Sequence, residues 1–373
     1  MTTETIVITG CGALTPVGLS AAATGAALRA GIARLQEIPG AFVDASFNDE
    51  KPACGGRVPL EWFEGEPTAE EWPGHERFGA PLPPPRHSLV APGVERVIGL
   101  AVPALQEALA AATGRQPPPG PVGLYLGVDE LERDAVLSAC CRQMAGMEVV
   151  PALFAEGRCA GLLALARAVA DLRQGTVAGA LVGGADSLIR APVLARLREQ
   201  GLLQSPAHPQ GIVPGEAAAF LFLETAGTAE RRGTLPQAQI LALAQGEEPT
   251  VGSEEPNQAV GLTQVLRQAI QEAGGLAAPP LVICDLNGDR YRAMEWAFAS
   301  LRTIGGLHGE AVLWHPADCI GDCGAASGPL NCLWATQAFG KGYARAERAL
   351  IWGASDNSRR AAAMLAPASS TSG

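Results

Sequence analysis

Aromatic residues, positive charge and long apolar runs are all scarce in this chain of 373 residues. Phe, Trp and Tyr together make up only 5% of it, and 27 Lys and Arg stand against 38 Asp and Glu, for a formal net charge of -11. No basic run occurs, so we expect no nucleic-acid partner, because a phosphate backbone is bound by a basic face. No window holds the roughly 18 consecutive apolar residues that a membrane span needs.

The cysteines form no recognisable framework either. There are nine, an odd number, scattered through apolar stretches, which is typical of reduced, buried thiols in a long chain. The first five residues carry no basic residue, and the apolar run after them is too short for a signal peptide. We therefore expect a cytoplasmic protein without a membrane span.

What the sequence does contain is an alternation of short apolar strands with helices rich in alanine. A strand, a tight turn and a Ser20-capped helix are expected over 5–31. Further helices are predicted at 94–112, 161–173, 261–273 and 325–338, and further strands at 121–128, 175–186, 217–224, 237–244, 280–285 and 349–353. This order predicts an α/β fold with largely parallel sheets.

Two similar halves, 1–230 and 231–365, each contain one strongly apolar helix. We expect a duplicated five-layered α-β-α-β-α arrangement with those two helices between the sheets. Residues 38–92 are rich in proline and glycine without a sustained period, and we interpret them as an extended surface excursion. The serine-rich tail, 366–373, is expected to be disordered.

Six segments also follow one another in a recognisable order. They lie at 7–18, 94–111, 122–127, 183–186 (Gly-Gly-Ala-Asp), 214–221 and 321–328 (Gly-Asp-Cys-Gly-Ala-Ala-Ser-Gly). Their residues and order resemble the β-ketoacyl-acyl-carrier-protein synthases of the thiolase superfamily over most of residues 5–358. The resemblance implies a thiolase-like fold that handles acyl groups without a cofactor or a metal.

The nucleophile of that family is a cysteine at the start of the central helix, where the helix end lowers its pKa. Counting back from Gly183 and Gly184 places this position on Arg158, with Cys159 next along the chain. Gly161 keeps the family's offset from Arg158, which argues against a one-residue slip. One residue turns a helix by about 100°, so we expect Cys159 to point elsewhere.

The two histidines of the family are replaced as well. Asn287, in the strand-end motif 285–289, takes the place of the first, and Asp322 after Gly321 takes the place of the second. Ala317 stands where the family has a lysine. An amide can still donate a hydrogen bond, but a carboxylate at the second position would repel a developing oxyanion. The resemblance therefore implies a protein that does not condense acyl chains.

Other features around these positions depart from the family. The 129–158 segment, which contributes to the homodimer face and the substrate tunnel, is shorter than in active synthases. The glycine-rich loop at the acyl entrance is altered over 352–357. We hypothesise that Arg158 forms a buried ion pair with Asp322 or Glu156 in place of the lost catalytic groups.

Several polar patterns admit a functional and a plain structural interpretation. The Asp-Leu-Asn-Gly-Asp run at 285–289 lacks the glycine and glutamate of a calcium loop, which favours a polar strand end. His315, Cys319 and Cys323 would suit a metal only on a helix, which the intervening proline and glycine disfavour. The adjacent cysteines at 140–141 more often fill a helix than form a redox pair.

The resemblance leads to two functional hypotheses. The first is a non-condensing partner subunit or a scaffold that binds acyl groups or a carrier protein, as chain-length-factor subunits lack the cysteine and pair with active synthases. It implies a homodimer, or a heterodimer with a related synthase, and an acyl carrier protein or another protein as partner. The alternative is a divergent acyltransferase, ketosynthase-like or thioesterase-like, that uses Cys159 with Asn287 and Asp322.

Overall fold

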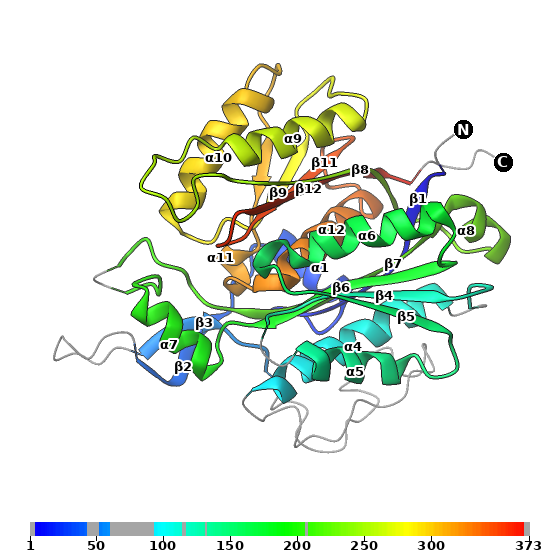
Figure 1. The fold of residues 1–373 in the computed structure, drawn as a ribbon, viewed down its shortest axis with the longest axis horizontal. Coiled ribbons are helices and arrows are strands. Elements are labelled where there is room, and N and C mark those ends of the chain that lie inside the picture. Colours follow the sequence, from blue (N-terminus) through cyan, green and yellow to red (C-terminus); the bar gives the residue numbers. More distant parts are fainter. Residues whose placement is uncertain are drawn as a thin grey trace.

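Two β-sheet layers enclose a layer of helices, and further helices cover both outer faces (Figure 1). The computed structural model describes residues 4–42, 52–59, 93–113, 117–130, 133–205 and 208–368. Within these residues ten strands are hydrogen-bonded in the order β10-β9-β11-β12-β8-β1-β7-β6-β4-β5. The order folds into two layers where β8 meets β1. The predicted five-layered thiolase-like arrangement is confirmed.

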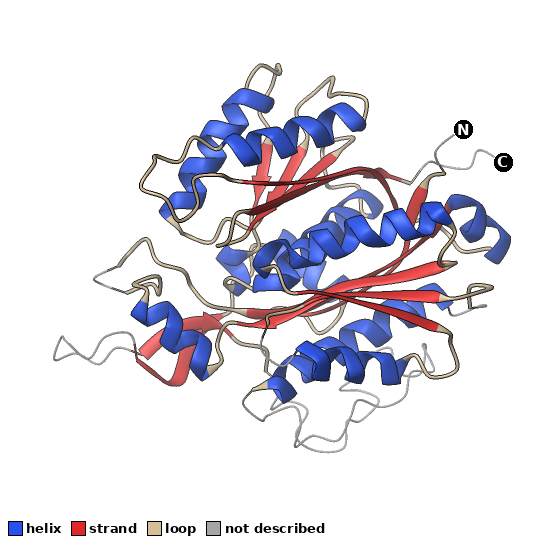
Figure 2. Ribbon diagram, in the orientation of Figure 1, coloured by secondary structure: helices blue, strands red, loops and turns tan. Residues whose placement is uncertain are grey.

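The first half of the chain builds one layer and its outer cover. Its elements are β1 (Ile6–Leu14), α4 (Val94–Thr113), β4 (Val122–Gly127), α5 (Arg133–Gln143), β5 (Val149–Phe154), β6 (Gly179–Ser187), α7 (Ala191–Glu199), β7 (Glu216–Thr225) and α8 (Ala226–Arg232). Helices α4 and α5 lie on the outer face of this sheet (Figure 2).

The second half repeats the arrangement. Its elements are β8 (Ala238–Glu247), α9 (Val260–Glu272), β9 (Leu281–Cys284), α10 (Arg290–Thr303), β10 (Val312–Trp314), α11 (Ala317–Ile320), β11 (Ala349–Ala354) and β12 (Arg359–Pro367). Helices α9 and α10 lie on the outer face of its sheet (Figure 2).

The sheets are mixed, so the expectation of largely parallel pairing was wrong. Strand β4 pairs in parallel with β5 and β6, and β9 pairs in parallel with β10 and β11. The pairs along the middle of the order are antiparallel. Strands β11 and β12 are joined by residues 355–358 alone, and a connection this short allows only antiparallel neighbours.

The layer between the sheets contains α6 (Ala160–Gln174), α12 (Ser327–Gly340) and α1 (Ala21–Arg29). Small residues allow these helices to approach each other closely. A Cβ added to Gly161 on α6 would overlap Cδ of Pro329 on α12. The Ser20 side chain caps α1 as predicted, accepting a hydrogen bond from the Ala23 N–H. This packing accounts for an alanine-rich and aromatic-poor composition.

Parts of the predicted excursion and tail lie outside the described residues, namely 43–51, 60–92 and 369–373. The excursion begins as a two-stranded hairpin of β2 (Leu35–Phe42) and β3 (Pro52–Gly56). The final strand, β12, continues through Pro367. The prediction that disorder begins at residue 366 was therefore wrong for the first residues of the tail. Among the helices of the described ranges, none has the length and apolar character of a membrane span.

Candidate functional site

The N-terminal end of α6 lies where loops from both halves of the chain meet. The single turn Gly157–Cys159 precedes the helix and carries Arg158. The segment after β9 supplies Asn287, and the turn at Gly321, whose φ of 76° is one that glycine adopts readily, supplies Asp322. The structure therefore brings together three of the positions predicted from the sequence.

Asp322 accepts hydrogen bonds from two side chains and one backbone N–H. Its Oδ2 lies 2.7 Å from Nε and 2.5 Å from Nη2 of Arg158, and 2.6 Å from Nδ2 of Asn287. Its Oδ1 accepts from the Gly324 N–H at 2.9 Å. Burial alone would raise the pKa of Asp322, but the Arg158 charge and its hydrogen bond hold that pKa below the ordinary value. The hypothesised Arg158–Asp322 ion pair is confirmed.

A second carboxylate, Asp356, joins Arg158 to another buried arginine. Its Oδ2 lies 2.7 Å from Nη1 of Arg158, and its Oδ1 lies 2.8 Å from Nη2 of Arg292. The two guanidinium groups are 5% and 3% exposed, whereas the Asp356 side chain is 63% exposed. Sequence reasoning missed both residues, although the altered 352–357 loop contains Asp356.

Arg292, on the first turn of α10, is anchored at the floor of the site. It contacts Oδ2 of Asp285 at 3.2 Å and the carbonyl of Ala354. Asp285 also accepts from the Ala354 N–H at 2.9 Å. Asp289 caps α10, accepting from the Tyr291 N–H at 2.9 Å. These contacts confirm that the Asp-x-Asn-x-Asp run is a polar strand end.

Cys159 points away from the arginine cluster. Its thiol is completely buried and donates to the carbonyl oxygens of Gly353 and Arg359, at 3.2 and 3.3 Å. Its backbone N–H donates to Oγ of Ser355 at 2.9 Å. Burial raises the pKa of the thiol to about 11. At neutral pH the group is a thiol and not a thiolate.

The remaining candidate positions lie apart from this cluster. Ala317, at the lysine position, begins α11 and contributes only a methyl group. Helix α11 covers only Ala317–Ile320 and ends at Gly321, so His315, Cys319 and Cys323 do not share one helix. His315 contacts Asp318 at 3.1 Å, and the described residues contain no group of three or more metal-ligating side chains. Cys140 is buried in α5, as a helix-filling residue would be.

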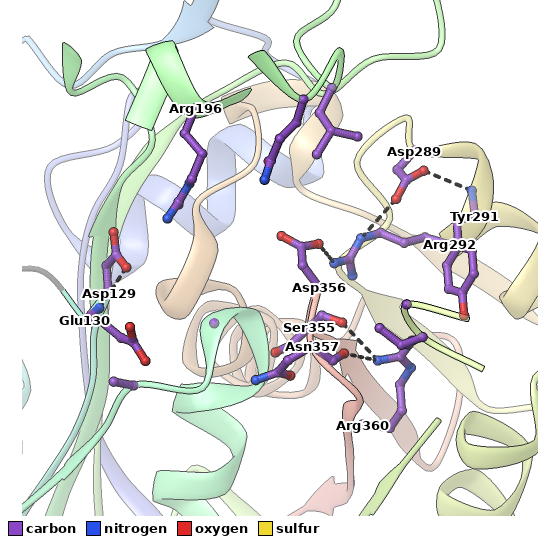
Figure 3. A pocket seen from close by; sticks show the side chains of 16 residues that line it. Asp129, Glu130, Arg196, Asp289, Tyr291, Arg292, Ser355, Asp356, Asn357 and Arg360 are labelled. Atoms are coloured by element: carbon purple, nitrogen blue, oxygen red, sulfur yellow. Dashed lines mark hydrogen bonds and ion pairs between the residues drawn. The ribbon is translucent and has the colours of Figure 1, made fainter. Parts of the chain in front are cut away.

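A pocket of about 510 Å³ opens above the cluster, between the two halves (Figure 3). Asp129, Glu130 and Arg196 line one wall, and Asp356 and Arg292 lie on the opposite wall. The exposed Arg196 makes no ion pair with any described residue. The pocket therefore has the exposed Arg196 and the buried Arg292 in its lining, and the buried Arg158 lies behind Asp356, to which it is bonded.

Residues 86–229 match the sequence model of the β-ketoacyl synthase N-terminal domain, and the fold extends that likeness over almost the whole chain. The structure titled "The ishigamide ketosynthase/chain length factor" has a TM-score of 0.77 at 18% identity, covering 98% of this chain and 99% of the other. The chain has a β-ketoacyl-synthase-like fold. No curated protein matches its sequence.

Two further solved structures resemble this chain. One is AntDE:AntF, a type II PKS acyl-carrier protein in complex with its ketosynthase bound to the hexaketide, with a TM-score of 0.76, 13% identity and coverage of 98% of this chain and 99% of that one. The other is the ketosynthase from module 6 of the bacillaene synthase of Bacillus subtilis 168, with a TM-score of 0.73, 16% identity and coverage of 98% and 72%. At these identities the likeness establishes the fold.

Proposed function

We propose that this synthase-like protein does not condense acyl chains and acts as a binding partner of a related synthase or an acyl carrier protein. The observation that carries the proposal is the pairing of the buried Arg158 with two carboxylates. Arg158 stands at the position that the family resemblance assigns to the nucleophile. A guanidinium cannot attack a thioester, and this one is held between Asp322 and Asp356. Asp322 places a negative charge where an oxyanion would need stabilisation.

The alternative, an acyltransferase using Cys159, has weaker support. A nucleophilic cysteine needs thiolate character and access to its substrate. The Cys159 thiol has neither, because it is buried, has a raised pKa and donates to two backbone carbonyls. Asn287 and Asp322, the two residues that this alternative pairs with Cys159, are both directed at the Arg158 cluster.

Carrier binding is supported by the charge at the pocket mouth. The phosphopantetheine arm of an acyl carrier protein brings a phosphate group, and arginine is well suited to contact phosphate. Arg196, on the exposed face of α7, lines the pocket without an ion-pair partner among the described residues. We assign it as the first contact of such an arm.

Association with a second subunit is supported by the edge of the first sheet. Within the described residues β5 pairs only with β4, leaving its other side without a strand. Val150 on this strand is 37% exposed. An uncovered apolar edge is a template for pairing with another chain. The solved ketosynthase/chain length factor is the fold relative that suggests a related synthase as that chain.

The test combines acyl transfer with carrier binding. The protein is mixed with an acyl-loaded carrier protein, and intact mass spectrometry should find no acyl adduct on either the wild type or Cys159→Ala. Fluorescence anisotropy with a labelled carrier protein should show binding that Arg196→Glu weakens about tenfold, or about 1.4 kcal/mol. Arg198→Glu, an exposed change on the same helix outside the pocket, is the matched control.

Two results would contradict the proposal in different ways. An adduct that forms on the wild type and disappears in Cys159→Ala would establish the acyltransferase alternative. If the carrier protein binds neither the wild type nor the Arg198→Glu variant, it is not a partner. A related synthase subunit would then be the one proposed partner that remains.

A further inference from the structure

Asp356 differs from the other carboxylates of the cluster because it is exposed to the pocket. Its side chain is 63% exposed, whereas those of Asp322 and Asp285 are each 2% exposed. It lies in the short turn between β11 and β12 and lines the pocket directly (Figure 3). Each of its oxygens is bound by a different buried arginine, Arg158 or Arg292. This is how a bound carboxylate ligand would be held.

We propose that Arg158 and Arg292 form a carboxylate-binding site behind Asp356 in the wall of the pocket, and that Asp356 is its resident occupant, which a carboxylate ligand displaces. The residues that form this site all come from this chain, so its assembly requires no protein partner. It is assembled from both halves of the chain, with one arginine before α6 and the other on α10.

The two arginines stay in place without Asp356. Arg158 retains its contacts of 2.7 and 2.5 Å to Asp322, and Arg292 retains Asp285 at 3.2 Å and the Ala354 carbonyl. The side chains are buried and oriented by these partners. The withdrawal of Asp356 would therefore leave Nη1 of Arg158 and Nη2 of Arg292 facing the pocket in fixed positions.

The charge balance favours displacement over simple addition. With Asp356 withdrawn, Arg158 keeps Asp322, and Arg292 keeps Asp285 at 3.2 Å and Asp289 at 3.7 Å. An incoming carboxylate then only restores the charge that Asp356 supplies now. A ligand bound beside Asp356 would instead add a further negative charge to a buried cluster in which carboxylates already outnumber the arginines, which is costly.

The rest of the pocket limits the kind of ligand. Glu130 lies on the wall across from Asp356 (Figure 3), and Asp129 beside it is paired with Arg190 at 3.0 Å. A second anionic group next to Glu130 would be repelled, whereas one next to Arg196 would not. The ligand that fits carries one carboxylate for the two arginines and leaves Glu130 without an anionic neighbour, within a volume of about 510 Å³.

Acetate is the probe for this site. In Asp356→Ala the vacated site should bind acetate, so the melting temperature of the variant should rise with acetate relative to chloride at equal ionic strength. Wild type should need at least about tenfold more acetate for the same rise, because Asp356 competes. A crystal structure of the variant in acetate should show the carboxylate bridging Arg158 and Arg292.

The control is Glu130→Ala, which removes the same charge from the opposite wall and should not create an acetate response. If Asp356→Ala fails to fold, Asp356→Ser, whose side chain is too short to reach both arginines, also vacates the site and replaces it in the assay. A folded variant that responds to acetate no more than Glu130→Ala, or that shows no acetate between the arginines, overturns the proposal.

Discussion

The Arg158–Asp322 pair is the residue-scale feature on which the site depends. Removing one partner of a buried ion pair costs about 3–5 kcal/mol when the remaining charge is left unpaired, and Arg158 would keep only the largely exposed Asp356 as its partner. We therefore expect Asp322→Ala to lower the free energy of unfolding by about 3 kcal/mol, the lower end of this range, measured by urea denaturation with an unchanged m-value. The double variant Arg158→Met/Asp322→Asn should recover much of the loss, because it removes both charges.

A surface pair supplies the comparison for that experiment. Arg359 and Glu247 lie 3.0 Å apart but are 40% and 59% exposed. Glu247→Ala should cost less than about 1 kcal/mol, as exposed pairs generally do. If Asp322→Ala costs no more than this control, the cluster does not stabilise the fold.

Asp186 predicts a pH dependence of stability. Burial, and then the nearby Asp129, raise its pKa to about 6. Because the folded state then binds the proton more tightly than the unfolded state, stability should rise as pH falls through 6 toward the ordinary value of 3.8. The slope from this group is at most about 1.4 kcal/mol per pH unit.

Urea denaturation across that pH window tests the Asp186 contribution. Asp186→Asn should remove this part of the slope, and Asp129→Asn should reduce it by lowering the Asp186 pKa. An Asp186→Asn protein with the wild-type slope would show that another group is responsible.

The sequence narrowed the partner of Arg158 to Asp322 or Glu156, because recognisable motifs fix these positions in the chain, and the structure shows Asp322 as the partner. The sequence was insufficient for Asp356 and Arg292. Asp356 lies in a turn whose residues no longer match the family pattern. Arg292 reaches the site only because α10 begins over the ends of β9 and β11, which no local pattern specifies.

At the scale of elements, the apolar pattern of a helix decides whether the sequence reveals it, as α6 and α10 show. Helix α6 has alanine and leucine around most of its circumference, so its apolar pattern was plain. Helix α10 was missed because its buried stripe includes Arg292 and Glu295. Their charges pair with Asp285 and Arg360, so hydrophobic periodicity cannot reveal that the stripe is buried.

The contact between α6 and α12 allows a prediction about helix packing. Alanine is the better helix former by about 1 kcal/mol, yet a Cβ at Gly161 would overlap Pro329 and lie 2.9 Å from the Ala325 carbonyl oxygen. We expect Gly161→Ala to destabilise the protein by about 1–3 kcal/mol, the usual cost of overpacking. Thermal unfolding with circular dichroism gives the measurement.

Gly340 is the matched control on α12, since a Cβ there meets no atom within 4 Å. Gly340→Ala should leave stability unchanged or raise it by up to about 1 kcal/mol. Equal effects of the two substitutions would mean that the close approach of α6 and α12 contributes nothing.

At the scale of the whole molecule, the layered arrangement could be predicted because each half repeats the same order of strands and helices. The direction of the central strands could not, since it depends on which strands become neighbours across the β8–β1 junction. That junction brings the loops of both halves to the N-terminal end of α6. The pocket and the arginine cluster are therefore properties of the complete fold and of neither half alone.

The two ends of the strand order provide a test of subunit association. Val150 on β5 and Val312 on β10 are the same residue type, are 37% and 40% exposed, and lie on opposite edge strands. If β5 is the edge that pairs with a second chain, Val150→Glu buries a charge in that contact, whereas Val312→Glu leaves its charge in solvent. Light scattering should then find the first variant monomeric and the second associated like the wild type. Dissociation by Val312→Glu alone would move the interface to the other edge.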